Sequence, residues 1–165
     1  MAELDIDEVG YPHESPNIDM ELYRLLACLF ASTTFSKLFS KEKGTHHWEY
    51  FKRMEFPEIC RILISIAAIT RNNLDAVHSL EKSKSPVGLL YLNGDDNREP
   101  ETLDFRQACN KILHATKVNP DVKDPSSGLA SPLTNLIHLY GVHGKQQWHA
   151  IIDIQHFALT ATKFT

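Results

Sequence analysis

The residues best suited to chemistry lie in the stretch 103–115. Asn110 and His114 are four residues apart, which places them on one face of a helix and one turn from each other. Arg106, four residues before Asn110, continues the same stripe. An amide and an imidazole beside a cation are able to position a ribose hydroxyl and move its proton. The alternative is that Asn110 and His114 serve structure alone, by bonding each other and nearby carbonyls.

A second pair with suitable spacing lies in the preceding predicted helix. Arg71 and His78 are seven residues apart, which is nearly two helical turns, so they share a face. A solvated, charged helix face produces the same pattern without any function. Arg71 is therefore only a candidate for binding a phosphate.

The segment 109–115, CNKILHA, resembles the signature helix of the HEPN superfamily. Members of that superfamily are helical-bundle domains, and many are metal-independent endoribonucleases of toxin–antitoxin, abortive-infection and CRISPR systems. Their motif is an Arg, usually followed by Asn, then three residues and His, often as RNKxxHA. The chain has Cys109 at the Arg position and matches the motif at Asn110, Lys111, His114 and Ala115. The resemblance covers about one helix.

The resemblance implies a protein that acts on or binds RNA, in conflicts between bacteria and mobile elements. It implies cleavage through the ribose 2′-hydroxyl without a metal or other cofactor, and a homodimer packed through this helix. His114 would transfer the proton and Asn110 would orient the substrate. The phosphate would be stabilised by Arg106 or Arg71, and Lys111 and Arg71 would contact the nucleic acid.

Cys109 keeps a different class of function open. A thiol cannot offer a phosphate the two-pronged hydrogen-bonding fork of an arginine. The alternative is therefore a non-enzymatic interaction protein, a degenerate HEPN-like domain that binds a protein partner or masks a nucleic-acid site. Whether the chain is an enzyme is left undecided by the sequence.

The third candidate is a histidine pair in a β-hairpin predicted over about 136–152. The dipeptide His143-Gly144 fits a two-residue turn, and counting outward from it places His138 opposite His149. Two imidazoles that face each other across strands are within reach of one metal ion. No further ligand stands at suitable spacing, apart from Asp153 further along. We therefore expect exposed hairpin histidines and no metal site.

Composition excludes several classes of protein. An apolar share of 42% and a charged share of 23% are typical of a folded globular domain. No apolar run reaches the roughly 18–20 residues that a membrane span requires. The three cysteines include no CxxC pair, which favours a reducing compartment, and the N-terminus lacks the pattern of a secretory signal. We expect a cytoplasmic protein with no membrane partner.

Charge and periodicity together predict the organisation of the chain. The first 21 residues hold seven acids and no Lys or Arg, so residues 1–16 are predicted to be an acidic, partly disordered leader. Residues 17–165 are predicted to form a single, mainly α domain, a helical bundle with a small C-terminal β-hairpin and a terminal helix. The predicted helices cover 17–40, 46–54, 58–82, 103–115 and 154–164, with a short strand at 87–92 and a long loop at 118–132.

Overall fold

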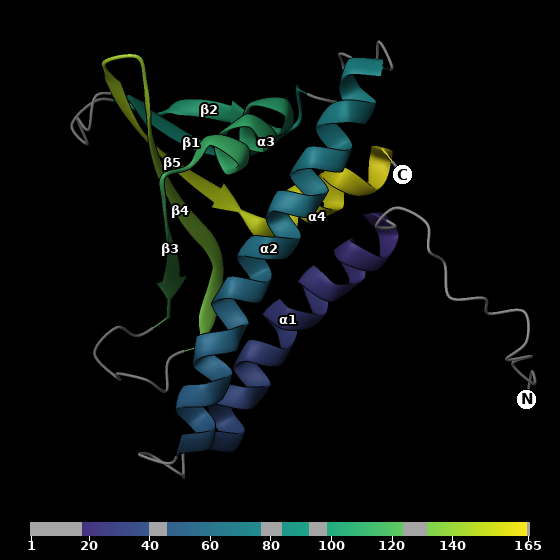
Figure 1. Cartoon of the computed structure of the whole chain (residues 1–165), viewed down its shortest axis with the longest axis vertical. Coiled ribbons are helices and arrows are strands. Elements are labelled where there is room, and N and C mark those ends of the chain that lie inside the picture. Colours follow the sequence, from purple (N-terminus) through teal and green to yellow (C-terminus); the bar gives the residue numbers. More distant parts are fainter. Residues whose placement is uncertain (1–17, 40–45, 77–83, 93–98, 124–131, 165) are drawn as a thin grey trace, which may run out of the picture.

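The computed structural model describes residues 18–39, 46–76, 84–92, 99–123 and 132–164 (Figure 1). The helices are α1 (Ile18–Phe39), α2 (His46–Ala76), α3 (Phe105–His114) and α4 (Ile154–Ala161), with a final 3₁₀ turn, η3 (Thr162–Phe164). The strands are β1 (Pro86–Leu92), β2 (Glu101–Asp104), β3 (Lys117–Val122), β4 (Leu133–His143) and β5 (Gln146–Asp153). Within the described residues these five strands form one antiparallel sheet in the order β2-β1-β5-β4-β3.

The predicted fold class, a mainly α bundle with one small hairpin, is wrong. The chain is an α+β protein, in which the predicted hairpin forms two strands of a five-stranded sheet. The hairpin strands pair with segments far away in sequence, because β5 pairs with β1 on one side and with β4 on the other. Local periodicity detects a strand only through its own residues, so it carries no information about such partners.

Two strands were missed for specific physical reasons. The prediction assigned 118–132 to a loop because of its prolines, yet Lys117–Val122 is strand β3. Pro120 is tolerated there because β3 is the edge of the sheet, where a missing N–H has no neighbouring strand to bond.

The helix predicted from Leu103 begins two residues later, at Phe105, because Asp104 caps it. The carboxylate of Asp104 accepts a hydrogen bond from the backbone N–H of Gln107, 2.7 Å away. The residues before the cap form β2.

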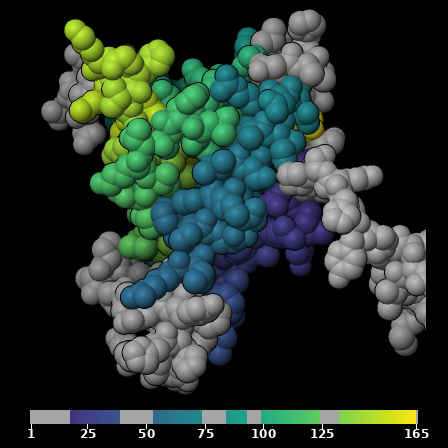
Figure 2. Space-filling view, in the orientation of Figure 1, coloured from purple at the N-terminus to yellow at the C-terminus, as the bar shows by residue number. Residues whose placement is uncertain are grey.

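The helices lie against one face of the sheet, and the core forms between them. Leu90, Leu139 and Ala150 lie side by side on neighbouring strands and are buried on that face. Phe105 of α3 packs there against Phe157 of α4, with ring centroids 4.9 Å apart. Figure 1 shows α1 and α2 together on one side of the molecule, with the strands on the other. In the space-filling view, α2 crosses the front and the β4–β5 hairpin stands at the upper left (Figure 2).

Helix α2 replaces two predicted helices, 46–54 and 58–82. It runs without a break from His46 to Ala76 and contains Pro57. A proline inside a helix leaves the carbonyl four residues earlier without its usual donor. Here that residue, Arg53, is exposed, as is Pro57, so water is able to satisfy the carbonyl. The predicted helix 17–40 is confirmed as α1, and the closing helix as α4 with η3.

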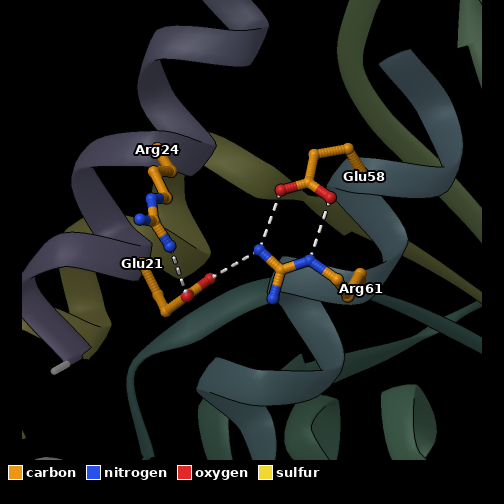
Figure 3. A network of polar contacts seen from close by, with 4 residues as sticks. All are labelled: Glu21, Arg24, Glu58 and Arg61. Atoms are coloured by element: carbon orange, nitrogen blue, oxygen red, sulfur yellow. Dashed lines mark hydrogen bonds and ion pairs between the residues drawn. The ribbon is translucent and has the colours of Figure 1, made fainter. Parts of the chain in front are cut away.

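A network of charged side chains joins α1 to α2 (Figure 3). Glu21 of α1 is only 5% exposed, and its carboxylate accepts hydrogen bonds from Arg24 at 3.2 Å and from Arg61 of α2 at 3.3 Å. Arg61 also donates two hydrogen bonds to Glu58, at 2.8 and 2.9 Å. Both arginines are half exposed, so the cations stay hydrated while the buried carboxylate is fully paired.

None of the helices that the structure describes is long and apolar enough to cross a membrane. The acidic leader predicted for residues 1–16 lies outside the described residues, as does His78.

Candidate nucleic-acid interface

The predicted catalytic pair lies on α3, as its spacing requires, but the two side chains are in different surroundings. His114 is exposed at the last residue of the helix, whereas Asn110 is partly buried. The side-chain oxygen of Asn110 is buried and accepts no hydrogen bond, so it does not bond the imidazole of His114. Arg106, one turn earlier, is also partly buried. The helix therefore carries the predicted residues without joining Asn110 to His114.

Cys109, which stands where the HEPN motif has its arginine, points into the core. Cys109 is fully buried, and burial raises the pKa of its thiol to about 12, slightly opposed by the nearby charge of Arg71. An arginine in this place would bring a guanidinium among Phe105, Ala108 and Ile112, the buried residues of α3. This position is thus part of the packing between α3 and the rest of the chain, and no side chain there is able to face a substrate.

The predicted nucleic-acid ligands Lys111 and Arg71 have different neighbours. The ammonium group of Lys111 lies 4.3 Å from the ring centre of Trp148 on β5, and burial lowers its pKa. Arg71 lies in α2, close enough to Cys109 to influence its thiol. The apolar side of α3, formed by Phe105, Ala108, Cys109 and Ile112, is buried within its own chain.

The face of the sheet away from the helices carries four aromatic side chains in contact, which we call the ring cluster: Tyr91, His138, Tyr140 and His149. The imidazole of His149 stacks on Tyr140 with ring centroids 4.5 Å apart, on His138 at 5.2 Å and on Tyr91 at 5.4 Å. All four are partly exposed. Neighbouring strands lie about 4.8 Å apart, so rings stacked at this spacing stand upright and present their edges to solvent.

The two histidines of the ring cluster touch directly. Nδ1 of His138 lies 3.0 Å from Nε2 of His149, a hydrogen-bond distance at which one nitrogen holds a proton and the other accepts it. The sequence placed these residues opposite each other, but the register differs by two: His138 is opposite Ile151, and Tyr140 is opposite His149. A shift of two keeps every side chain on its face, so the histidines still meet, as diagonal neighbours.

Lys117 supplies a cation beside the ring cluster. It lies directly opposite Tyr140 on the neighbouring strand, and its ammonium group is 5.5 Å from the tyrosine ring centre. The start of β3 is fixed by Thr116, whose backbone N–H donates to the carbonyl of Tyr140 at 2.8 Å. A hollow of about 450 Å³ opens here, and its lining includes Thr116, Lys117, Tyr140, Val142, Gln147 and His149.

The donors of this face favour an anionic or hydroxyl-rich ligand over a metal. Phenol hydroxyls, an amide, imidazole nitrogens and an ammonium group are hydrogen-bond donors that suit phosphate and sugar oxygens. Among the described residues, no three His, Cys, Asp or Glu side chains gather where they could hold a metal ion.

Sequence reasoning found His138 and His149 but missed Tyr91 and Lys117. Tyr91 belongs to a strand that the sequence did predict, and its alternation with Leu90 and Leu92 was the available signal. Lys117 directly precedes a segment that was predicted to be a loop.

The comparisons with protein-family models, curated proteins and solved structures return no match. The resemblance to the HEPN superfamily therefore depends on residues 109–115 alone.

Proposed function

We propose that this protein binds single-stranded RNA across the open face of its sheet, over the ring cluster and Lys117. The observation that carries the proposal is the row of stacked rings with a hydrogen-bonded histidine pair within it and a lysine at its end. Aromatic side chains on an uncovered antiparallel sheet, combined with positive charge, are a common arrangement for binding single-stranded nucleic acid.

The geometry favours recognition of the RNA backbone. Because the rings stand upright, their polar edges face the ligand, where hydroxyl and imidazole groups donate to phosphate oxygens and to the ribose 2′-hydroxyl. Lys117 adds the charge that makes such binding dependent on salt. The hollow of about 450 Å³ beside Tyr140 falls within the size range of small-ligand sites.

Binding is favoured over cleavage. The cleavage mechanism implied by the resemblance needs a cation beside His114. The residue at the position of the motif arginine, Cys109, is a thiol buried in the core. The two histidines of the ring cluster are in direct contact, so they do not leave room for a phosphate between a general base and a general acid.

The test measures the affinity of the purified chain for a fluorescent single-stranded RNA at two salt concentrations, with single-stranded DNA in parallel and EDTA present. We expect Tyr140→Ala to weaken binding roughly 10- to 150-fold, which corresponds to the loss of one hydrogen bond from the phenol hydroxyl to a charged phosphate. Lys117→Ala should weaken binding and reduce the salt slope by about 1.

Matched controls are Leu159→Ala and Lys163→Ala, which alter exposed side chains on α4 and η3. Both should bind like the natural protein. Absence of RNA binding at low salt, or binding that neither Tyr140→Ala nor Lys117→Ala weakens, would refute the proposal. RNA cut in EDTA by the natural protein but not by His114→Ala would restore the ribonuclease hypothesis instead.

A further inference from the structure

Helix α1 is apolar on two opposite sides. One side is in the core, where Leu22, Leu25 and Leu29 are buried. The opposite side holds an outer stripe in which four large apolar side chains are 50–70% exposed: Met20, Tyr23, Phe30 and Leu38. A soluble helix normally carries polar residues opposite its buried side. The outer stripe is therefore apolar surface that no other part of the described structure, residues 18–39, 46–76, 84–92, 99–123 and 132–164, buries.

The outer stripe has the spacing of a helix–helix contact. Exposed Ala27 and Thr34 complete it, so its members recur at steps of three and four residues along α1. This spacing keeps side chains in one line along a helix and is the pattern that a second helix packs against. The outer stripe contains both large side chains that protrude and small side chains that leave space for a protruding side chain of a second helix.

We propose that the outer stripe binds the same helix of a second copy of this chain, with the two helices antiparallel. In that arrangement Phe30 faces Ala27 of the second copy, Tyr23 faces Thr34, and Met20 faces Leu38. Each large ring then meets a small side chain, and the twofold symmetry repeats every contact. A parallel pair would instead oppose Tyr23 to Tyr23 and Phe30 to Phe30, which leaves gaps at the small residues.

Charge supports the same orientation. Asp19 and Lys37 are exposed and separated by 18 residues, which is five helical turns, so they lie on the same flank of the outer stripe. Antiparallel helices bring Asp19 of each copy beside Lys37 of the other. Parallel helices would bring Asp19 to Asp19 and Lys37 to Lys37, where like charges repel.

The test is sedimentation velocity of the full chain over a range of micromolar concentrations. We expect a monomer–dimer equilibrium in the natural protein and a monomer for Phe30→Glu, because each copy would then place a carboxylate between the two outer stripes. The control Ile64→Glu changes an apolar side chain on α2 that is 50% exposed and lies outside the outer stripe, and this variant should remain dimeric. A natural protein that stays monomeric, or a dimer that survives Phe30→Glu, would overturn the proposal.

Charge reversal tests the orientation and does not depend on the folding of the first variant. Asp19→Lys and Lys37→Asp should each weaken the dimer, and the double variant should recover the natural affinity. Single reversals that leave the dimer unchanged, or a double variant that recovers nothing, would exclude the antiparallel arrangement. Circular dichroism of each variant establishes that α1 remains helical.

Discussion

Nδ1 of His138 and Nε2 of His149 lie 3.0 Å apart on the open face of the sheet, although the two residues are not opposite each other in the β4–β5 ladder. The contact is diagonal, and it places His149 between the rings of Tyr91 and Tyr140. One imidazole thereby links side chains from three adjacent strands. This arrangement makes the centre of the sheet the most distinctive polar surface among the described residues, and it underlies the proposed RNA site.

The buried position of Cys109 predicts that an arginine there, as in the HEPN motif that the segment resembles, will unfold the protein. Cys109→Arg should lower the free energy of unfolding by several kcal/mol, roughly 3–5, because an unpaired guanidinium would be buried in an apolar core. Cys109→Ala should cost only about 1–2 kcal/mol, the loss of a small buried side chain. Urea denaturation followed by circular dichroism measures both. A stable Cys109→Arg protein would show that this side of α3 is accessible.

The carboxylate of Glu21 is predicted to stabilise the contact between α1 and α2. Glu21→Gln should lower the free energy of unfolding by about 1–2 kcal/mol, because a buried, charge-assisted pairing with two arginines becomes neutral. Glu58→Gln is the matched control, since Glu58 is 42% exposed and its pairing with Arg61 is weakened by solvent, so the loss should stay below about 1 kcal/mol. Equal losses in thermal or urea unfolding would contradict this ranking.

The Glu58–Arg61 pairing also predicts a pH dependence. The hydrogen bond from Arg61 lowers the pKa of Glu58 below its ordinary value of 4.5. A lowered pKa in the folded state means that the contribution is complete above 4.5 and is lost as the pH falls through the lowered value. The difference in stability between the natural protein and Glu58→Gln should therefore shrink in acid. A difference that grows as the pH falls would have the wrong sign.

Two glycines of the hairpin are predicted to differ in what they tolerate. A Cβ on Gly141 would lie 2.1 Å from the indole of Trp148, so Gly141→Ala should cost about 1–3 kcal/mol through overpacking and should change the tryptophan fluorescence. A Cβ on Gly144 would meet no atom within 4 Å, but the backbone φ of Gly144 is +62°, which side-chain-bearing residues rarely adopt. Gly144→Ala should therefore cost about 1 kcal/mol and leave the fluorescence unchanged. Similar spectra for both variants would show that Trp148 does not pack on Gly141.

The sequence predicted those elements whose signal is local. The apolar repeat of α1 and the closing helix depend on residues close in the chain, and both elements are present. The turn between β4 and β5 is local too, but it lies at Gly144-Lys145, because His143 still pairs with Gln146, and the predicted turn at His143-Gly144 is wrong by one residue. The sheet was missed because strand pairing joins distant segments, as between Leu90 and Ala150. Local sequence patterns do not predict that Pro120 lies in an edge strand or that α2 continues through Pro57. Both outcomes depend on which backbone groups remain in contact with water, and that is decided by the packing of the whole fold.

The candidate site was predicted in part. The two histidines were expected to lie directly opposite each other. They are diagonal neighbours instead, and they still meet because an error of two residues in register preserves the face of a strand. Tyr91 and Lys117 come from β1 and β3, whose places beside the hairpin only the sheet order reveals. Asn110 and His114 were expected to share one face of a helix, and both lie on α3, but Asn110 is partly buried while His114 is in solvent.

The most direct measurement is an imidazole ¹H–¹⁵N correlation spectrum of the protein during titration with a short single-stranded RNA. It reports separately on the ring cluster, through His138 and His149, and on α3, through His114, with the exposed His156 of α4 as a control. Binding across the open face predicts that the resonances of His138 and His149 move with RNA concentration while those of His114 and His156 stay in place. Movement of His114 with no change at His138 and His149 would contradict the account.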